Sequence, residues 1–376
     1  MQRVRFVAAF VGACLGLLCL RPIATAGETL SVEKAKVEND MAWYDIKLLG
    51  LEGQGFTDTS APYDRLPGRA EKIVRPPVWG LSRDSAGMAV RFITDSTELS
   101  ARWKLTKAKL EMPHMPATGV SGLDLYVKGD DGKWRWVVNG KPTAQESNAK
   151  LFSGVAPGKH EFLLYLPLYN GVTSVEIGVP KTAVLAQADA RKSGLKPIVF
   201  WGTSITHGAC ASRPGMVHTA ILGRWLDAPV INLGFSGNGQ MEPEVAQLIS
   251  EIDASCYVID CLPNLEAAAV AQRTEPLVAI LRKVHPTTPI VLVEDRSYAD
   301  SHFITSKRTR NLKSREALKA AFDKLKPSDA NLHYIAGEDL LGDDWEGTVD
   351  SSHPTDLGFM RQAEAFQKVL GPVLKK

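Results

Sequence analysis

Short apolar runs alternate with segments of helical periodicity through the second half of the chain, and this alternation constrains the fold more than any other feature. Apolar residues recur at helical spacing after Glu242-Pro243 and again after Thr274-Glu-Pro276. Strands that alternate with amphipathic helices are typical of βαβ units and a parallel sheet, and right-handed crossovers place helices on both of its faces. We therefore expect parallel strands at residues 198–201, 230–233, 257–262, 290–293 and 332–335.

The first half of the chain has a different pattern. From about residue 28 to 180, stretches such as 88–94 and 98–105 alternate apolar and polar residues, and turns rich in Gly, Asp and Pro separate them. Several short strands at close spacing predict an antiparallel β-sandwich of the jelly-roll kind. The tryptophans of this region are either core residues or stacking platforms for sugar rings, and both interpretations stay open: Trp43, Trp79, Trp103, Trp134 and Trp136.

The N-terminus has the features of a targeting segment. Arg3 and Arg5 give a positive start, an apolar stretch covers residues 6–20, and Ala24-Thr-Ala26 is a small-residue cleavage site. This pattern predicts a secretory signal peptide over residues 1–26, because the apolar stretch is short for a membrane span. We expect a secreted or periplasmic protein without stable membrane insertion.

A change of periodicity after a linker at about 180–196 predicts two domains. The β-sandwich domain covers 27–185 and the α/β domain covers 196–376. A net charge of +2 disfavours a nucleic-acid partner, which would require a concentrated basic surface. The basic residues at 307–315 form either a solvated helix face or a rim that attracts anionic polymers.

Three cysteines follow the predicted cleavage site. Cys210, Cys256 and Cys261 have neither the number of a disulfide framework nor the spacing of a metal site. We expect three free thiols, with a bridge from Cys210 to one of the other two as the alternative.

Ser204 comes directly after the first predicted parallel strand, which ends at Gly202. The crevice beyond the carboxyl ends of the strands is where ligands bind in an open α/β sheet. A serine at this point would meet substrate while the strand holds its backbone. The alternative is an ordinary strand-to-helix turn in which Ser and Thr side chains cap the next segment.

A carboxylate and an imidazole lie near the C-terminus, in Asp350-Ser-Ser-His-Pro354. Pro354 suits the first position of the last helix, which we expect to run to about Leu370. Asp350 can reach Nδ1 of His353 across a tight turn and leave Nε2 free, as a general base beside a serine hydroxyl requires. The alternative is a local hydrogen bond within a loop.

Two more loops follow predicted strands. Glycines in the run 232–239 allow backbone N–H groups to face a ligand, and the run 260–264 places an amide side chain, Asn264, at the end of the third strand. Each loop alone is equally compatible with an ordinary turn. Together with Ser204 and His353 they would supply a nucleophile, a base and oxyanion donors.

Taken in order, these blocks resemble those of the SGNH (GDSL-type) serine hydrolases. Residues 202–206 are similar to the nucleophile block and residues 236–238 to the second block. Residues 262–264 are similar to the third block, and residues 350–353 to the D-x-x-H block. Gly119-Val-Ser-Gly-Leu-Asp-Leu-Tyr126 resembles the small β domain that precedes the catalytic domain in one bacterial branch of the family. The resemblance implies a flavodoxin-like, three-layer SGNH hydrolase domain after the β-sandwich.

The resemblance also implies roles for individual residues. Ser204, His353 and Asp350 would form a catalytic triad, and an oxyanion hole would consist of the backbone N–H groups of Ser204 and Gly237 and the side chain of Asn264. The chain departs from the family pattern at Thr203, which replaces an Asp, and at Leu262 and Leu265, which replace the Gly and Asp that flank the Asn of the third block.

The predicted activity is hydrolysis of acyl esters by a serine esterase through an acyl-enzyme, without a metal or an organic cofactor. Export, the β domain and the resemblance favour an acetylated carbohydrate or polysaccharide as the substrate. One alternative is a lipid or thioester acylhydrolase, and another is a non-catalytic carbohydrate-binding protein that retains the fold. His207 and His218 are close to Ser204 in sequence, and a metal pair there is the rival to a serine mechanism.

Overall fold

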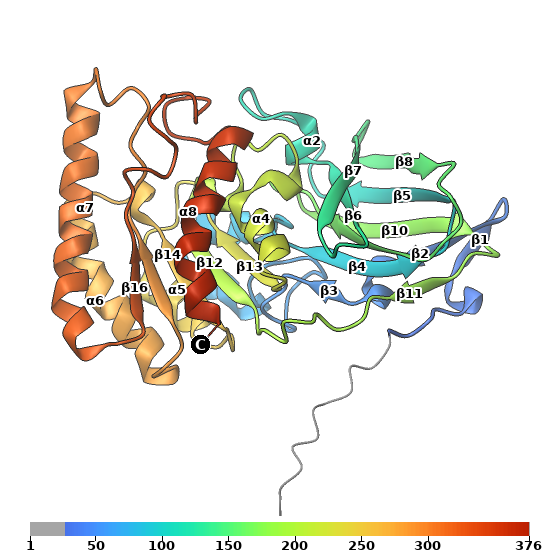
Figure 1. Ribbon diagram of the computed structural model, residues 1–376, viewed down its shortest axis with the longest axis horizontal. Helices are drawn as coiled ribbons and strands as arrows, with labels where there is room; N and C mark the ends of the chain where they lie inside the picture. Colours follow the sequence, from blue (N-terminus) through green and yellow to red (C-terminus); the bar gives the residue numbers. More distant parts are fainter. Residues whose placement is uncertain (1–26, 376) are drawn as a thin grey trace, which may run out of the picture.

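The computed structural model describes residues 27–375, which form antiparallel sheets at one end of an elongated molecule and a helix-covered parallel sheet at the other (Figure 1). The predicted signal peptide, residues 1–26, lies outside the described residues and stays a prediction. Within the described range, none of the helices has the length and apolar character needed to cross a membrane.

Five parallel strands form the sheet of the C-terminal domain, as the alternation of apolar runs and helical segments predicted. Their order across the sheet is β13-β12-β14-β15-β16, which is the flavodoxin-like order 2-1-3-4-5. The strands are β12 (Ile198–Gly202), β13 (Val230–Gly234), β14 (Cys256–Asp260), β15 (Ile290–Val293) and β16 (Leu332–Ile335).

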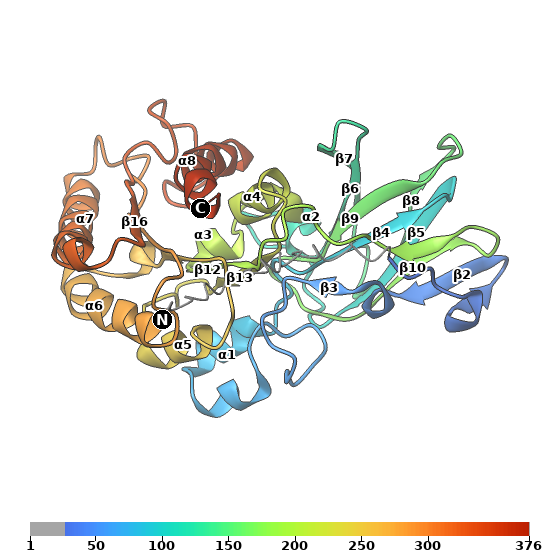
Figure 2. The ribbon, with the colours of Figure 1, turned by 60° about the horizontal axis from the view of Figure 1, so that its bottom comes forward.

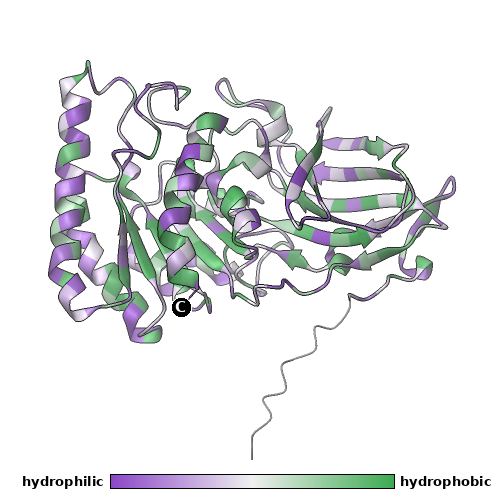
Figure 3. Ribbon diagram, viewed as in Figure 1, coloured by the Kyte–Doolittle hydropathy of each residue, from purple (hydrophilic) through white to green (hydrophobic). Residues whose placement is uncertain are grey.

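Side chains of the central strand alternate between two cores. Phe200 of β12 packs with α4 (His218–Trp225) and α8 (Asp356–Leu374) on one face. Trp201 belongs to the core on the other face, which is covered by α5 (Pro243–Ile249), α6 (Ala267–Val284) and α7 (Thr305–Leu325). The strands of this sheet are hydrophobic, whereas the outer helix α7 is largely hydrophilic (Figure 3). The predicted three-layer α/β domain is therefore confirmed.

Two helix starts differ from the sequence-based expectation. Asp356, not Pro354, begins α8, because Thr355 caps the helix: its hydroxyl accepts a hydrogen bond from the N–H of Gly358. The helix α6 begins well before Pro276 and continues through it. Pro276 and Gln272 are both exposed, so solvent can satisfy the carbonyl that the proline leaves without a donor.

The N-terminal region contains two packed antiparallel sheets with one core between them, which confirms the predicted β-sandwich. One sheet has the order β1 (Lys36–Glu38), β2 (Met41–Asp45), β10 (Val172–Pro180), β5 (Glu98–Leu105) and β8 (Glu146–Ser153). The other has the order β11 (Leu185–Gln187), β4 (Ala89–Thr94), β9 (His160–Tyr165), β6 (Leu123–Lys128) and β7 (Trp134–Gly140), and β3 (Leu51–Glu52) pairs with β4.

The tryptophans of the β-sandwich divide between the two interpretations. Trp103 is buried in the core between the two sheets, Trp43 is buried beneath the guanidinium of Arg102, and Trp136 is 50% exposed. Trp136 donates a hydrogen bond through Nε1 to Asp124, and the guanidinium of Arg213 lies over its ring. Its indole is therefore held by polar partners at the surface rather than by a core.

Residues 54–84 pack on the parallel sheet of the other domain, although they fall within the range for which the sequence predicted β-strands. This 54–84 segment contains α1 (Pro76–Ser82) and a short 3-10 helix, Gly68–Lys72, and α1 lies beside α5 (Figure 2). Its buried apolar residues are spaced four apart and join the core that includes Trp201: Leu66, Ala70, Val74 and Val78. That spacing is a helical signal that the period-two reading of the region missed.

Asp124 of β6 makes a second connection between the two regions. Its buried carboxylate accepts hydrogen bonds from Nη1 of Arg213 (2.9 Å) and from the N–H of Gly215 (2.8 Å), both in the α/β domain. Arg224 of α4 lies over the ring of Tyr126 from the same strand. The run 119–126 that resembled the family's β domain therefore docks the β-sandwich on the α/β domain.

Candidate active site

Ser204 is the first residue of α3 (Ser204–His207), the short helix that follows β12. Thr203 caps this helix, because its hydroxyl accepts a hydrogen bond from the N–H of Ile205. A side chain at Gly202 could not fit, since its Cβ would lie 2.0 Å from the hydroxyl of Thr206. The tight packing places the nucleophile candidate directly beyond the carboxyl end of the central strand.

The structure brings Ser204, His353 and Asp350 together. Oγ of Ser204 lies 2.8 Å from Nε2 of His353, and Nδ1 of His353 lies 2.7 Å from a carboxylate oxygen of Asp350. The other carboxylate oxygen accepts the backbone N–H groups of His353 (2.8 Å) and Ser352 (3.1 Å). Ser351 adopts a positive φ of 78°, which closes the turn that joins the carboxylate to the imidazole.

The electrostatics of this turn favour an ionised carboxylate. Burial raises the pKa of Asp350, but the hydrogen bonds from the backbone and ring of His353 and from Ser352 outweigh it, so that its pKa is lowered below 3.8. An ionised Asp350 binds the Nδ1–H of His353 and leaves the lone pair of Nε2 to accept the proton of Ser204. This arrangement is able to activate a serine hydroxyl.

Gly237 lies on the loop after β13 and is exposed with a φ of 67°. Its backbone N–H makes no hydrogen bond to another residue of the described chain. Below it, Asn232 donates a hydrogen bond through Nδ2 to the carbonyl of Thr206 (2.6 Å) and accepts one from the N–H of Gly234 (2.9 Å). The loop therefore starts from a fixed base and presents an unused donor.

Two arginines of the 54–84 segment hold this loop. Arg75 donates hydrogen bonds through Nη1 to Oδ1 of Asn238 (2.7 Å) and through Nη2 to the Asn238 carbonyl (3.2 Å). The fully buried Arg65 donates to the carbonyls of Asn232 (3.1 Å) and Gly234 (2.8 Å). Sequence reasoning missed both residues, because contacts with partners more than 150 residues away leave no local signal.

Asn264 ends a short 3-10 helix, Leu262–Asn264, that follows β14. Its side-chain oxygen is buried, and the structure gives its amide no hydrogen bond to the described chain. Arg310 of α7 fixes the loop, because Nη2 donates to the carbonyls of Pro263 (3.0 Å) and Leu265 (3.1 Å). The Nδ2 group of Asn264 donates to no residue of the described chain, so an anchored loop presents a side-chain donor that a ligand can use.

The three loops start side by side. In the register of the sheet, Gly202 of β12 pairs with Gly234 of β13 on one side and with Asp260 of β14 on the other. The chain segments that carry Ser204, Gly237 and Asn264 therefore leave neighbouring strands at the same edge. The predicted site residues share one edge of the sheet, and their chemical roles stay predictions.

The N-terminal region also reaches the site directly. Tyr169, which follows β9, donates a hydrogen bond from its hydroxyl to the carbonyl of Ser204 (3.2 Å) and stacks on the ring of His207 at 4.0 Å. Burial raises the pKa of Tyr169, so the hydroxyl remains a donor. His114, on the loop after β5, places its ring 5.9 Å from that of His353.

His207 and His218 do not form a metal pair. Both are completely buried, and burial lowers the pKa of each imidazole well below its usual value. Nε2 of His207 lies 2.7 Å from the carbonyl of Leu168, whereas the ring of His218 stacks on Phe359. The two rings have separate partners, so they have separate structural environments.

The basic residues at 307–315 are largely paired rather than solvated. Lys307 binds Asp300 and Ser351, Arg310 binds Asp295, and Arg315 donates to the carbonyl of Asp295. These three side chains hold loops at the carboxyl edge of the sheet. They therefore form neither a solvated helix face nor a rim that attracts anionic polymers.

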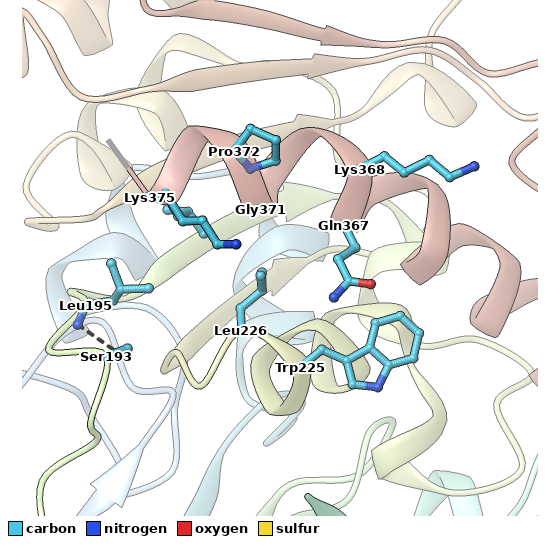
Figure 4. A pocket seen from close by; sticks show the side chains of 10 residues that line it. Ser193, Leu195, Trp225, Leu226, Gln367, Lys368, Gly371, Pro372 and Lys375 are labelled. Carbon is cyan, nitrogen blue, oxygen red and sulfur yellow. Dashed lines mark hydrogen bonds between the residues drawn. The ribbon is translucent and has the colours of Figure 1, made fainter. Parts of the chain in front are cut away.

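A cavity of about 930 Å³ lies elsewhere (Figure 4). It is lined by the end of α8, by Trp225 and Leu226 at the end of α4, and by Leu195 before β12. These residues lie at the amino edge of the parallel sheet. Ser204 lies at the opposite edge, so this cavity is not part of the candidate active site.

The chain matches two protein families. Residues 195–371 match the GDSL-like lipase/acylhydrolase family, and residues 41–185 match the family described as the GxDLY N-terminus of SGNH-hydro-type esterases. No curated protein matches the chain.

Solved structures extend the comparison to both regions. A Bacteroides ovatus protein named a GDSL-like lipase is 35% identical, with a TM-score of 0.84 over 89% of this chain and 98% of its own. The salicylyl-acyltransferase SsfX3 from a tetracycline biosynthetic pathway is 21% identical, with a TM-score of 0.68 over 93% and 98%. A family two carbohydrate esterase from Clostridium thermocellum, in complex with cellohexaose, is 17% identical, with a TM-score of 0.52 over 77% and 96%.

Proposed function

Because the chain belongs to the GDSL-like lipase/acylhydrolase family and is an esterase, we propose that it removes acyl groups, chiefly acetyl groups, from a carbohydrate or polysaccharide. The observation that carries the proposal is the chain of contacts from Ser204 through His353 to Asp350, at 2.8 Å and 2.7 Å. These distances suit proton transfer from the hydroxyl to the imidazole.

The mechanism follows from these contacts. His353 takes the proton of Ser204 through Nε2 while Oγ attacks the ester carbonyl, and Asp350 stabilises the imidazolium that forms. The N–H groups of Ser204 and Gly237 and the amide of Asn264 would bind the oxyanion. His353 then returns its proton to the leaving sugar hydroxyl, and water activated by the same imidazole hydrolyses the acyl-enzyme.

Three features support a carbohydrate substrate. The fold is shared with a carbohydrate esterase whose structure holds cellohexaose. The β-sandwich exposes Trp136, a residue type that stacks on sugar rings. The N-terminal sequence predicts a signal peptide, and we propose export to the periplasm or the medium, where polysaccharides are accessible.

Release of acyl groups from a panel of esters tests the proposal. The panel contains acetylated monosaccharides, acetylated xylan and mannan, acyl esters of increasing chain length and acyl thioesters, and Ser204→Ala protein serves as the blank. We expect the highest kcat/KM on acetylated saccharides. A preference for long acyl chains or thioesters would assign the enzyme to lipid or thioester hydrolysis instead, and saccharide binding without any turnover would assign it to carbohydrate binding.

A further inference from the structure

Three potential metal ligands from distant parts of the sequence lie around His353. They are His114 on the loop after β5, Cys210 after α3, and His353 itself. Each offers one ligand atom, and these atoms all lie within 4.8 Å of one another. The sequence spacing could not show this group, because its members come from both domains and from three separate loops.

Two of the three have no role in the serine mechanism. The side chain of His114 is exposed at the tip of a turn closed by the backbone pair Met112 and Met115, and its contact with the described chain is the ring of His353. Cys210 is buried and free, and it adopts a φ of 69°. A left-handed conformation is unfavourable for a residue with a Cβ, so the surrounding structure holds this thiol in place.

His353 already has the arrangement of a metal-binding histidine. Asp350 binds the Nδ1–H of its ring, which fixes the tautomer and leaves the lone pair on Nε2, the nitrogen that faces Oγ of Ser204. Histidines that bind metals are commonly oriented by a carboxylate in the same way. The feature that prepares the imidazole to accept a proton therefore also prepares it to accept a cation.

We propose that His114, Cys210 and His353 form a binding site for Zn²⁺ at the mouth of the active site, and that zinc bound there inhibits the esterase. Two imidazoles and a thiolate are a ligand set that zinc favours, and the fourth tetrahedral position is left for water. Tetrahedral ligands of zinc lie about 3.3–3.8 Å apart. Rotation of the exposed His114 side chain closes the remaining gap.

Binding involves no oxidation. Zinc displaces the proton of the Cys210 thiol, which passes to solvent, and the sulfur forms the bond to zinc. Nε2 of His353 bonds to zinc in place of accepting the proton of Ser204. The serine hydroxyl then lacks a base, so turnover stops for as long as the ion is bound. The metal site stands on its own geometry, and only the inhibition rests on the proposed function.

Cobalt spectroscopy on the purified protein tests the binding. Co²⁺ replaces Zn²⁺ in such sites, and a cobalt–thiolate bond gives a charge-transfer band that a site without sulfur lacks. We expect the band to saturate at one equivalent of Co²⁺, to disappear when Zn²⁺ is added, and to be absent from Cys210→Ser protein. A parent protein without the band would overturn the proposed site.

Zinc titration of turnover tests the inhibition, with each variant compared with its own rate in EDTA. We expect His114→Ala to raise the inhibition constant for zinc at least about tenfold, because one of three protein ligands is lost. His160→Ala, a histidine on β9 outside the group, should leave the constant unchanged. Equal constants for the parent and His114→Ala would place inhibitory zinc elsewhere, and full turnover of cobalt-saturated protein would show that the ion leaves His353 free; either result contradicts the proposal.

Discussion

The loops that carry Gly237 and Asn264 leave the same edge of the parallel sheet, but they are held in different ways. Arg75, from the 54–84 segment, holds the first through both the side chain and the carbonyl of Asn238. Arg310, on α7 of the α/β domain itself, holds the second through two carbonyls.

The difference shows where the N-terminal region matters for the chemistry. Charge-assisted hydrogen bonds from a rigid guanidinium fix both loops. The position of the Gly237 donor depends on a segment from the N-terminal part of the chain, whereas the position of the Asn264 donor depends only on the domain that contains it. The turn with Asp350 and His353 is a third case, since its own backbone N–H groups bind the carboxylate.

The largest expected effect tests the premise that both loops serve an attack by Ser204. Ser204→Ala should lower kcat on an acetyl ester by a factor on the order of 10⁶, because no other group can form the acyl-enzyme. Its thermal unfolding should match that of the parent. A folded alanine variant with undiminished turnover would show that Ser204 is not the nucleophile and that the two loops do not serve its attack.

Asn264→Ala tests the loop that the α/β domain holds by itself. We expect kcat to fall by about 10²–10³ with a much smaller change in KM, since the amide binds charge that develops in the transition state. Steady-state kinetics on one acetyl ester give both constants. If kcat stays within about twofold of the parent, Asn264 is a structural residue at the end of a strand and the oxyanion has two donors.

Arg75→Ala tests the loop that the N-terminal segment holds. A displaced Gly237 should lower kcat by roughly 10- to 100-fold, as a small misplacement of a catalytic group does, and leave KM nearly unchanged. Arg69→Ala is the matched control. Arg69 lies in the same segment and pairs with Asp58 and Glu251, but it does not contact the loop. Equal kcat values for the two variants would show that the segment only packs on the domain.

The locally held turn should show its own pH dependence. The pKa of Asp350 in the folded protein is lowered below its ordinary value, so its contribution to stability is present above about pH 4 and is lost as the pH falls through the folded pKa. The difference in free energy of unfolding between the parent and Asp350→Asn should therefore shrink as the pH falls below about 4. Urea unfolding at several pH values below about 4 measures it, and a difference that grows on acidification through this range contradicts the assignment.

The smallest expected effect is the coupling between the two loops. Since separate arginines hold them, the losses in kcat of Arg75→Ala and Asn264→Ala should multiply in the double variant, with a coupling below about 0.5 kcal/mol. A double-mutant cycle on kcat provides the value. Coupling well above this limit would mean that the two loops move together and that they are not held independently by separate arginines.

Much of the fold was predictable because its signals are local. Apolar runs and helical spacing predicted the parallel sheet, and period-two alternation predicted the β-sandwich. The 54–84 segment was the exception, because a sparse helical face of Leu66, Ala70, Val74 and Val78 was read together with the β pattern around it.

The sequence by itself determined the groups that could react: a serine after a buried strand, a carboxylate and an imidazole on one turn, and polar loops after two neighbouring strands. Such groups sit at fixed offsets from regular elements, so a short stretch of chain identifies each. Only the tertiary structure decided what holds them. Arg75, Arg310, Tyr169 and the zinc-ligand candidate His114 act on partners far away in sequence, and an arginine that reaches a distant carbonyl has the same local pattern as one in solvent.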